Sequence, residues 1–96
     1  TIQEMLQDFR VSAEKIATEI QVAYQAEQWA MVGSAAHKLK SSARSVGALA
    51  LGELCAEIER AGKQSEVMTL KELLPRFNTE MAVVVAYLDS LHEKSG

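Results

Sequence analysis

Apolar residues recur at intervals of three and four along four stretches of this 96-residue chain. This spacing places them on one side of an α-helix and leaves the other side polar. The stretches run from about residue 3 to 25, 27 to 45, 49 to 61 and 66 to 92. Helices with a single apolar stripe each can bury it by packing around one shared core. The sequence therefore predicts an all-α fold, an up-down antiparallel four-helix bundle that forms a single domain over residues 1–96.

The predicted core consists of the apolar residues of these stripes: Leu6, Phe9, Ala13, Ile16, Ile20 and Ala23; Trp29, Val32, Ala36, Leu39, Ala43 and Val46; Leu51, Leu54, Cys55 and Ile58; Leu70, Leu73, Phe77, Met81, Val84, Leu88 and Leu91. Gly47 and Gly62 follow the second and third stripes, where glycine commonly ends a helix. Ser65 or Thr69 is expected to cap the last helix. Pro75 is expected to kink that helix or to weaken its first turn, because proline has no amide hydrogen.

Composition excludes several classes of protein. Hydrophobic residues make up 48% of the chain, which is enough for a single core and excludes a disordered tail. The net charge of −3 argues against a nucleic-acid binder. No apolar run approaches the roughly 20 residues that span a membrane, so no direct membrane contact is expected. The single cysteine, Cys55, fits a cytoplasmic protein, and its apolar face indicates a buried structural thiol. The chain opens on Thr1, which is compatible with a domain of a longer protein.

His37 lies in the second helical stretch, within the segment AAHKLKSSARSVGA. Each helical residue turns the chain by about 100°, which sets Val32, Leu39 and Ala43 roughly 200–240° away from His37. The imidazole is therefore expected to point into water, opposite the core. Its neighbours on the helix surface are small or basic: Gly33, Ser34, Lys40, Ser41 and Arg44.

This setting suits a particular chemistry. An exposed neutral imidazole is a nucleophile near neutral pH. Lys40 and Arg44 would attract an anion such as a phosphoryl group and would disfavour protonation of the ring. Gly33 and Ser41 would keep the approach to the ring open, and Gly33 would also let another backbone come close. The pattern fits a histidine that accepts a phosphoryl group on a ring nitrogen, and the alternative is a solvated side chain without a function.

The segment HKLKSSARSVGA, followed by LGELCAEIE, resembles the histidine-containing phosphotransfer (HPt) domain family, whose members carry H-x-x-K-G-[SA] on the second long helix. His37, Lys40 and Ser42 match this motif, and Gly47 matches the glycine that closes the helix. The residues that match the following helix are Leu54, Cys55, Ile58 and Glu59. Ser41 departs from the family, which has glycine there; as a small residue it should preserve access to His37.

The resemblance implies a phosphorelay carrier of two-component signal transduction. His37 would accept a phosphoryl group on Nε2 from the aspartate of a response-regulator receiver domain and pass it to another receiver. Lys40 would stabilise the phosphoryl charge, Arg44 would help more weakly, and the Ser41 hydroxyl would donate to the phosphoryl oxygens. Glu59 would orient the ring through Nδ1, or it is simply a surface acid. The chain would have no kinase activity of its own and no cofactor, because the receiver supplies the Mg²⁺.

We expect a cytoplasmic monomer, either standing alone or as the cytoplasmic part of a membrane-bound hybrid sensor kinase. The surface that docks a receiver should consist of apolar and small residues around His37 on the first two helices. A metal site is not expected, because His37 and His92 lie on different helices and Cys55 is the only thiol.

Three alternatives stay open. A histidine-kinase dimerisation domain would have an acid after the histidine and a proline a few residues later, whereas Lys38 follows His37 and the first proline is Pro75. A helical interaction module would dock partners without being phosphorylated. A small helical enzyme would need paired carboxylates near His37, a Ser-His-Asp set or a glycine-rich phosphate loop, and none is found.

Overall fold

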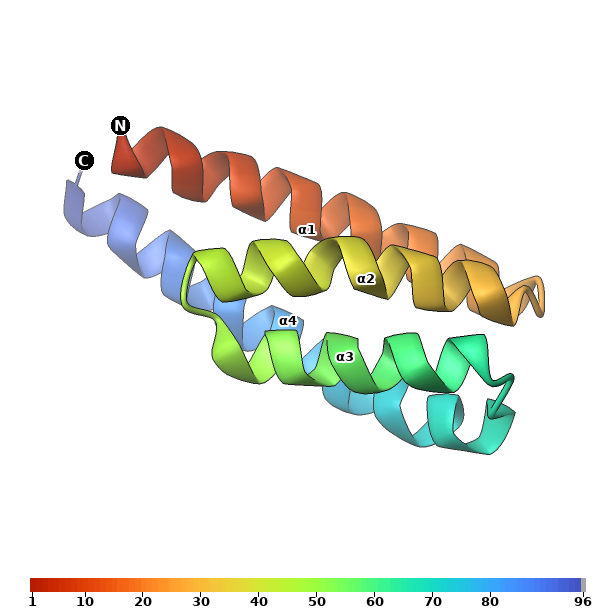
Figure 1. Cartoon of the computed structure of the whole chain (residues 1–96). Coiled ribbons are helices and arrows are strands. Elements are labelled where there is room, and N and C mark those ends of the chain that lie inside the picture. The colour runs from red at the N-terminus through yellow and green to blue at the C-terminus, as the bar shows by residue number, and fades with distance from the viewer. Residues whose placement is uncertain (96) are drawn as a thin grey trace.

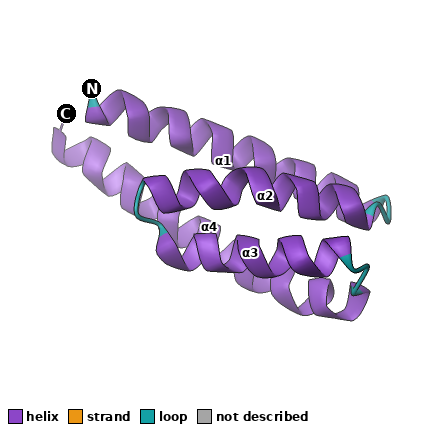
Figure 2. Ribbon diagram, in the orientation of Figure 1, coloured by secondary structure: helices purple, strands orange, loops and turns teal. Residues whose placement is uncertain are grey.

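The computed structural model describes the backbone of residues 1–95 and the side chains of residues 1–91. It contains four helices, α1 (Ile2–Gln25), α2 (Trp29–Ser45), α3 (Leu49–Lys63) and α4 (Val67–Ser95). Consecutive helices run antiparallel and pack side by side, and α1 also contacts α4, which closes the bundle (Figure 1). The described backbone has no strand (Figure 2). The predicted all-α, up-down four-helix bundle is confirmed.

The first and last helices are longer than the two between them, with 24 and 29 residues against 17 and 15. The start of α1 and the end of α4 project together beyond the turn between α2 and α3 (Figure 1). Arg10 of α1 forms an ion pair with Asp89 of α4. Further along, Gln21 Nε2 donates to Asn78 Oδ1 at 3.1 Å. These polar contacts link the two long helices at two points along their length.

The three links between helices share one geometry. Each has three residues, and the middle residue has a left-handed backbone: Glu27 (φ 57°), Gly47 (φ 85°) and Ser65 (φ 54°). The amide after the left-handed residue donates to a carbonyl five residues earlier, as Ala48 N does to Ala43 O at 2.8 Å. This is the Schellman arrangement, which satisfies free carbonyls at a helix end. Gly47 therefore ends α2 as predicted.

Other predicted helix signals are wrong. Gly62 does not end α3 but lies inside it, and the left-handed residue of that link is Ser65. Neither predicted cap directly precedes α4, because Ser65 belongs to the link and Thr69 lies within the first turn of the helix. Pro75 is the ninth residue of an unbroken α4, so it separates no weak first turn from the helix, while the alternative of a kink at Pro75 stays a prediction.

One continuous core runs along the bundle. Its fully buried centre includes Ile20, Leu39 and Phe77, one each from α1, α2 and α4. All four predicted core residues of α3 are buried. The predicted residues that are only half-buried are Leu6, Trp29, Val46, Val84 and Leu91. The predicted core is therefore confirmed apart from these positions. Among the described residues, no helix is both long and apolar enough to cross a membrane.

Candidate functional site

His37 lies on the solvent side of α2, where 60% of its side chain is exposed. Leu39, two residues further on, is fully buried on the opposite side of the helix. The prediction that the ring faces water is therefore confirmed. Ser34 and Ser41, one turn before and after His37, are also exposed. Small side chains thus line the approach to the ring along α2.

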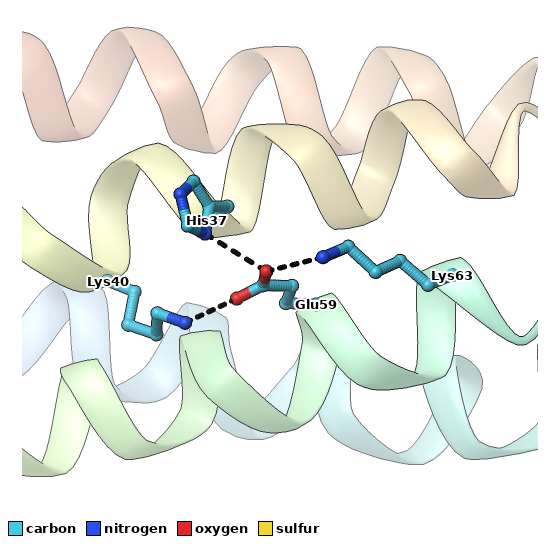
Figure 3. Close-up of polar contacts among 4 residues, drawn as sticks. All are labelled: His37, Lys40, Glu59 and Lys63. Carbon is cyan, nitrogen blue, oxygen red and sulfur yellow. Dashed lines mark hydrogen bonds and ion pairs between the residues drawn. The ribbon is translucent and has the colours of Figure 1, made fainter.

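Glu59 reaches the ring from the neighbouring helix α3. Its Oε2 atom lies 2.9 Å from Nδ1 of His37 (Figure 3). Only 7% of Glu59 is exposed. Of the two alternatives that the sequence left open for this residue, the surface acid is therefore excluded. Glu59 is a buried carboxylate in direct contact with the imidazole.

Two lysines complete the cluster around this carboxylate. Lys40 Nζ donates to Oε1 at 2.6 Å, and Lys63 Nζ donates to Oε2 at 2.9 Å (Figure 3). The hydrogen bonds from Lys40 and Lys63, together with a smaller effect of His37, lower the pKa of Glu59 from 4.5 to about 2. Burial alone would raise that pKa, so the cations prevail. Glu59 is therefore ionised at neutral pH.

The charge of Glu59 decides which ring nitrogen carries the hydrogen. An ionised carboxylate only accepts hydrogen bonds, so Nδ1 of His37 is the donor in this contact. In the neutral ring this leaves Nε2 with a free lone pair. The second ring nitrogen faces away from Glu59 (Figure 3). In its neutral form the exposed ring thus offers one nitrogen without a hydrogen as a nucleophile.

Lys40 and Arg44, the two cations predicted to stand beside the ring, have other neighbours in the structure. Lys40 is only 22% exposed, and its ammonium group binds Glu59, because a buried carboxylate requires a counter-charge. Arg44 packs across α3, where a Cβ added to Gly52 would lie 3.0 Å from Arg44 Cγ. The absent side chain of Gly52 provides the room for this packing. The proposed help of Arg44 in phosphoryl transfer stays a prediction.

Gly33 does not lie on the open approach to the ring, so that predicted role is wrong, whereas the predicted close approach of another backbone is confirmed. It is buried where α2 crosses α3, and a Cβ there would lie 2.9 Å from the carbonyl oxygen of Glu59. The backbone that approaches Gly33 is thus that of α3.

Sequence reasoning also missed Lys63, although its position four residues after Glu59 is the spacing of helical ion pairs.

A groove between α1 and α2 begins beside His37. It has a volume of about 820 Å³. Val22 of α1 and Met31 of α2 form its apolar wall and are 62% and 58% exposed. The remaining residues that line it are Lys15, Thr18, Glu19, Ala23, Ser34, Ala35 and Lys38. An apolar surface with charged edges therefore adjoins the nucleophile.

Cys55 and His92, the other residues considered as metal ligands in the sequence, are not described as part of this site. Cys55 is fully buried, and burial raises the pKa of its thiol to about 12, so it is the structural thiol that was predicted. The side chain of His92 lies outside the described residues. Among the described side chains, no group of three or more His, Cys, Asp or Glu residues is placed to hold a metal ion.

Comparison with known proteins relates this geometry to a family. The sequence profile of the Hpt domain matches residues 4–92. The fold is similar to the crystal structure of histidine-containing phosphotransfer protein B (HptB) from Pseudomonas aeruginosa PAO1, with a TM-score of 0.91 and 22% sequence identity; the match covers 96% of this chain and 80% of that chain. Curated protein sequences give no match. Because the family profile covers nearly the whole chain, the protein belongs to the Hpt domain family, the histidine phosphotransfer carriers of two-component phosphorelays.

Proposed function

We propose that Nε2 of His37 is the phosphoacceptor of this domain. It takes a phosphoryl group from the aspartyl phosphate of a receiver domain and passes it to the aspartate of another receiver. The observation that supports this proposal is the contact of an exposed ring with an ionised, buried carboxylate, at 2.9 Å between His37 Nδ1 and Glu59 Oε2. That contact holds the ring in one orientation and keeps the hydrogen away from Nε2.

The transfer needs no general base on this chain. The lone pair of His37 Nε2 forms a bond to phosphorus while the bond from phosphorus to the aspartate oxygen breaks, and the aspartate leaves as a carboxylate. The hydrogen on Nδ1 stays in place, so the phosphorylated ring gains a positive charge. Glu59 faces this charge and stabilises it as it develops. The second transfer follows the same path in reverse, and both depend mainly on positioning.

Lys40 is proposed to follow the phosphoryl group. Before transfer its ammonium group binds Glu59, and we propose that it turns toward the phosphoryl group when that group arrives. Lys63 then remains as the counter-charge of Glu59 and keeps that carboxylate ionised. The phosphoryl oxygens carry negative charge that a lysine ammonium can bind as a point charge. The exposed hydroxyl of Ser41 is proposed as a further donor to the phosphoryl oxygens.

The receiver is proposed to dock over the groove beside His37. Val22 and Met31 offer the apolar contact, and Lys15 at its edge complements the acidic phosphorylation pocket of a receiver, while Lys38 there is paired with Glu19. The Mg²⁺ ion belongs to that pocket, and this chain contributes no cofactor and no kinase activity. We expect the domain to act as a monomer in the cytoplasm.

The proposal is tested by incubating the chain with a receiver that carries ³²P-phosphate. Label that is lost in acid and retained in base should appear on the wild type and be absent from His37→Gln. The alternative, a module that docks partners without being phosphorylated, predicts that the relay works equally well with His37→Gln.

A further inference from the structure

Two buried glycines bring α2 and α3 into unusually close contact. A Cβ added to Gly62 would lie 2.6 Å from Gly33 N and 2.7 Å from Trp29 O, and a Cβ added to Gly33 would lie 2.9 Å from Glu59 O. Real Cβ atoms do not come within 3.0 Å of such neighbours. The neighbours are backbone atoms, which cannot rotate away as a side chain does. Any larger residue at either position would therefore push the two helices apart.

This crossing lies one helical turn from the functional pair. His37 follows Gly33 by four residues on α2, and Glu59 precedes Gly62 by three residues on the antiparallel α3, so the two contacts occupy adjacent turns. The atom that a Cβ on Gly33 would meet first is the backbone carbonyl oxygen of Glu59 itself. The bond from His37 Nδ1 to Glu59 Oε2 is 2.9 Å long. Hydrogen bonds are lost beyond roughly 3.5 Å, so a separation of well under 1 Å between the helices weakens it.

We propose that Gly33 and Gly62 are positioning residues for phosphoryl transfer. They set the distance between α2 and α3 at which Glu59 can hold the His37 ring with its hydrogen on Nδ1. They act through Glu59 and touch no reacting atom. This inference rests on the proposed function of His37, but the position of the ring hydrogen is measurable without any phosphoryl transfer.

The same interface supplies a matched control. Gly52 lies on α3 near the other end of its contact with α2, and it is buried as well. A Cβ added there would meet the flexible side chain of Arg44, with Cγ at 3.0 Å and Nε at 3.5 Å, and the carbonyl oxygen of Lys40 at 3.7 Å. The Arg44 side chain can move aside, so Gly52→Ala leaves the helix separation unchanged.

The test compares Gly62→Ala with Gly52→Ala in the full chain. Circular dichroism checks that each variant folds, and NMR of ¹⁵N-histidine shows which nitrogen of His37 carries the hydrogen. Phosphoramidate serves as a phosphoryl donor that needs no docking: Nε2 attacks phosphorus, the P–N bond of the donor breaks and ammonia leaves. Gly62→Ala should gain the tautomer with hydrogen on Nε2 and react roughly tenfold more slowly. Gly52→Ala should keep the wild-type tautomer, and any change in its rate should match that of Arg44→Ala, because the added Cβ moves only the Arg44 side chain.

Gly33→Ala is the second variant, because its closest contact of 2.9 Å is milder than the 2.6 Å of Gly62. It should shift the tautomer in the same direction by a smaller amount. A folded Gly62→Ala or Gly33→Ala protein with the wild-type tautomer and rate would overturn the inference. Failure of the wild type to take up phosphate on His37 would instead refute the proposed function, and the NMR comparison would still decide the role of the two glycines.

Discussion

Oε2 of Glu59 lies 2.9 Å from Nδ1 of His37, so a buried carboxylate on α3 holds an exposed imidazole on α2. The same oxygen accepts a hydrogen bond from Lys63, and the other carboxylate oxygen accepts one from Lys40. A buried carboxylate without partners would become protonated. Because the two lysines keep Glu59 ionised, it can orient the ring, and in the proposed transfer it would also face the positive charge of the phosphorylated ring.

Acid should remove the stability that Glu59 provides. Its pKa falls from 4.5 to about 2 in the fold, which means that folding favours the ionised form. This contribution is complete above pH 4.5, and it is lost as the pH falls from there to about 2. We expect a loss on the order of 3 kcal/mol in the free energy of unfolding. Urea unfolding at several pH values measures this. Over this pH window the free energy of unfolding should change less for Glu59→Gln than for the wild type. Parallel profiles for the two proteins would contradict the ion cluster.

Cys55 should be inert in the folded protein. It is fully buried, and burial raises the pKa of its thiol to about 12, so almost no thiolate is present at pH 8. A disulfide reagent such as Ellman's reagent should react only as fast as the bundle opens, and at full speed in urea. Rapid modification of the native protein would show that α3 is not packed as described.

Two aromatic residues of α4 should differ sharply in their effect on stability. Phe77 is fully buried, whereas Tyr87 is 63% exposed. Phe77→Ala removes core contacts and leaves a cavity, which should lower the free energy of unfolding by about 3–5 kcal/mol. Tyr87→Ala should change it by no more than about 0.5 kcal/mol. Thermal and urea denaturation measure the stability of both variants. Similar losses for the two would mean that the buried and exposed faces of α4 are assigned wrongly.

The groove beside His37 should control receiver binding. A charge at Val22 or Met31 would place a carboxylate in the apolar contact, so Val22→Glu and Met31→Glu should weaken receiver affinity roughly tenfold or more. Val83→Glu is the matched control, since Val83 is 55% exposed on α4 and lies outside the groove. Calorimetry with a receiver measures the affinities. Equal losses at all three sites would argue against docking over the groove.

Lys40 should affect transfer more than folding. Lys40→Ala removes the proposed counter-charge of the phosphoryl group, and we expect transfer from a receiver to slow roughly tenfold. Glu59 keeps Lys63 and His37 as partners, so the bundle should still fold. Lys71→Ala, an exposed lysine of α4, serves as the control. A Lys40→Ala protein that transfers at the wild-type rate would remove Lys40 from the mechanism.

Much of the fold could be predicted from the sequence because it follows from local periodicity. The stripe that contains Leu39 fixes the inner side of α2, and a turn of 100° per residue then places His37 outside. Gly47 could be assigned as a helix end because its role is local and shows as a left-handed backbone. These features depend on residues that are near one another in the chain.

What could not be predicted depends on the register between helices. Lys40 is next to His37 on the helix surface, but its long side chain turns to a carboxylate that belongs to α3. Gly62 has the sequence position of a helix stop, and only its contact with Gly33 shows that its missing side chain serves close packing. Periodicity within one helix carries no information about such contacts.

The most direct test of the central claim is to locate the phosphoryl group on the ring. The chain has two histidines, so ¹⁵N-histidine labelling gives a simple spectrum in which His37→Gln identifies the signals of His37. After phosphorylation by a receiver, a one-bond ¹⁵N–³¹P coupling should appear at Nε2 of His37, while Nδ1 keeps its hydrogen. A coupling at Nδ1, or phosphate on any other residue, would contradict the assignment of His37 Nε2 as the phosphoacceptor.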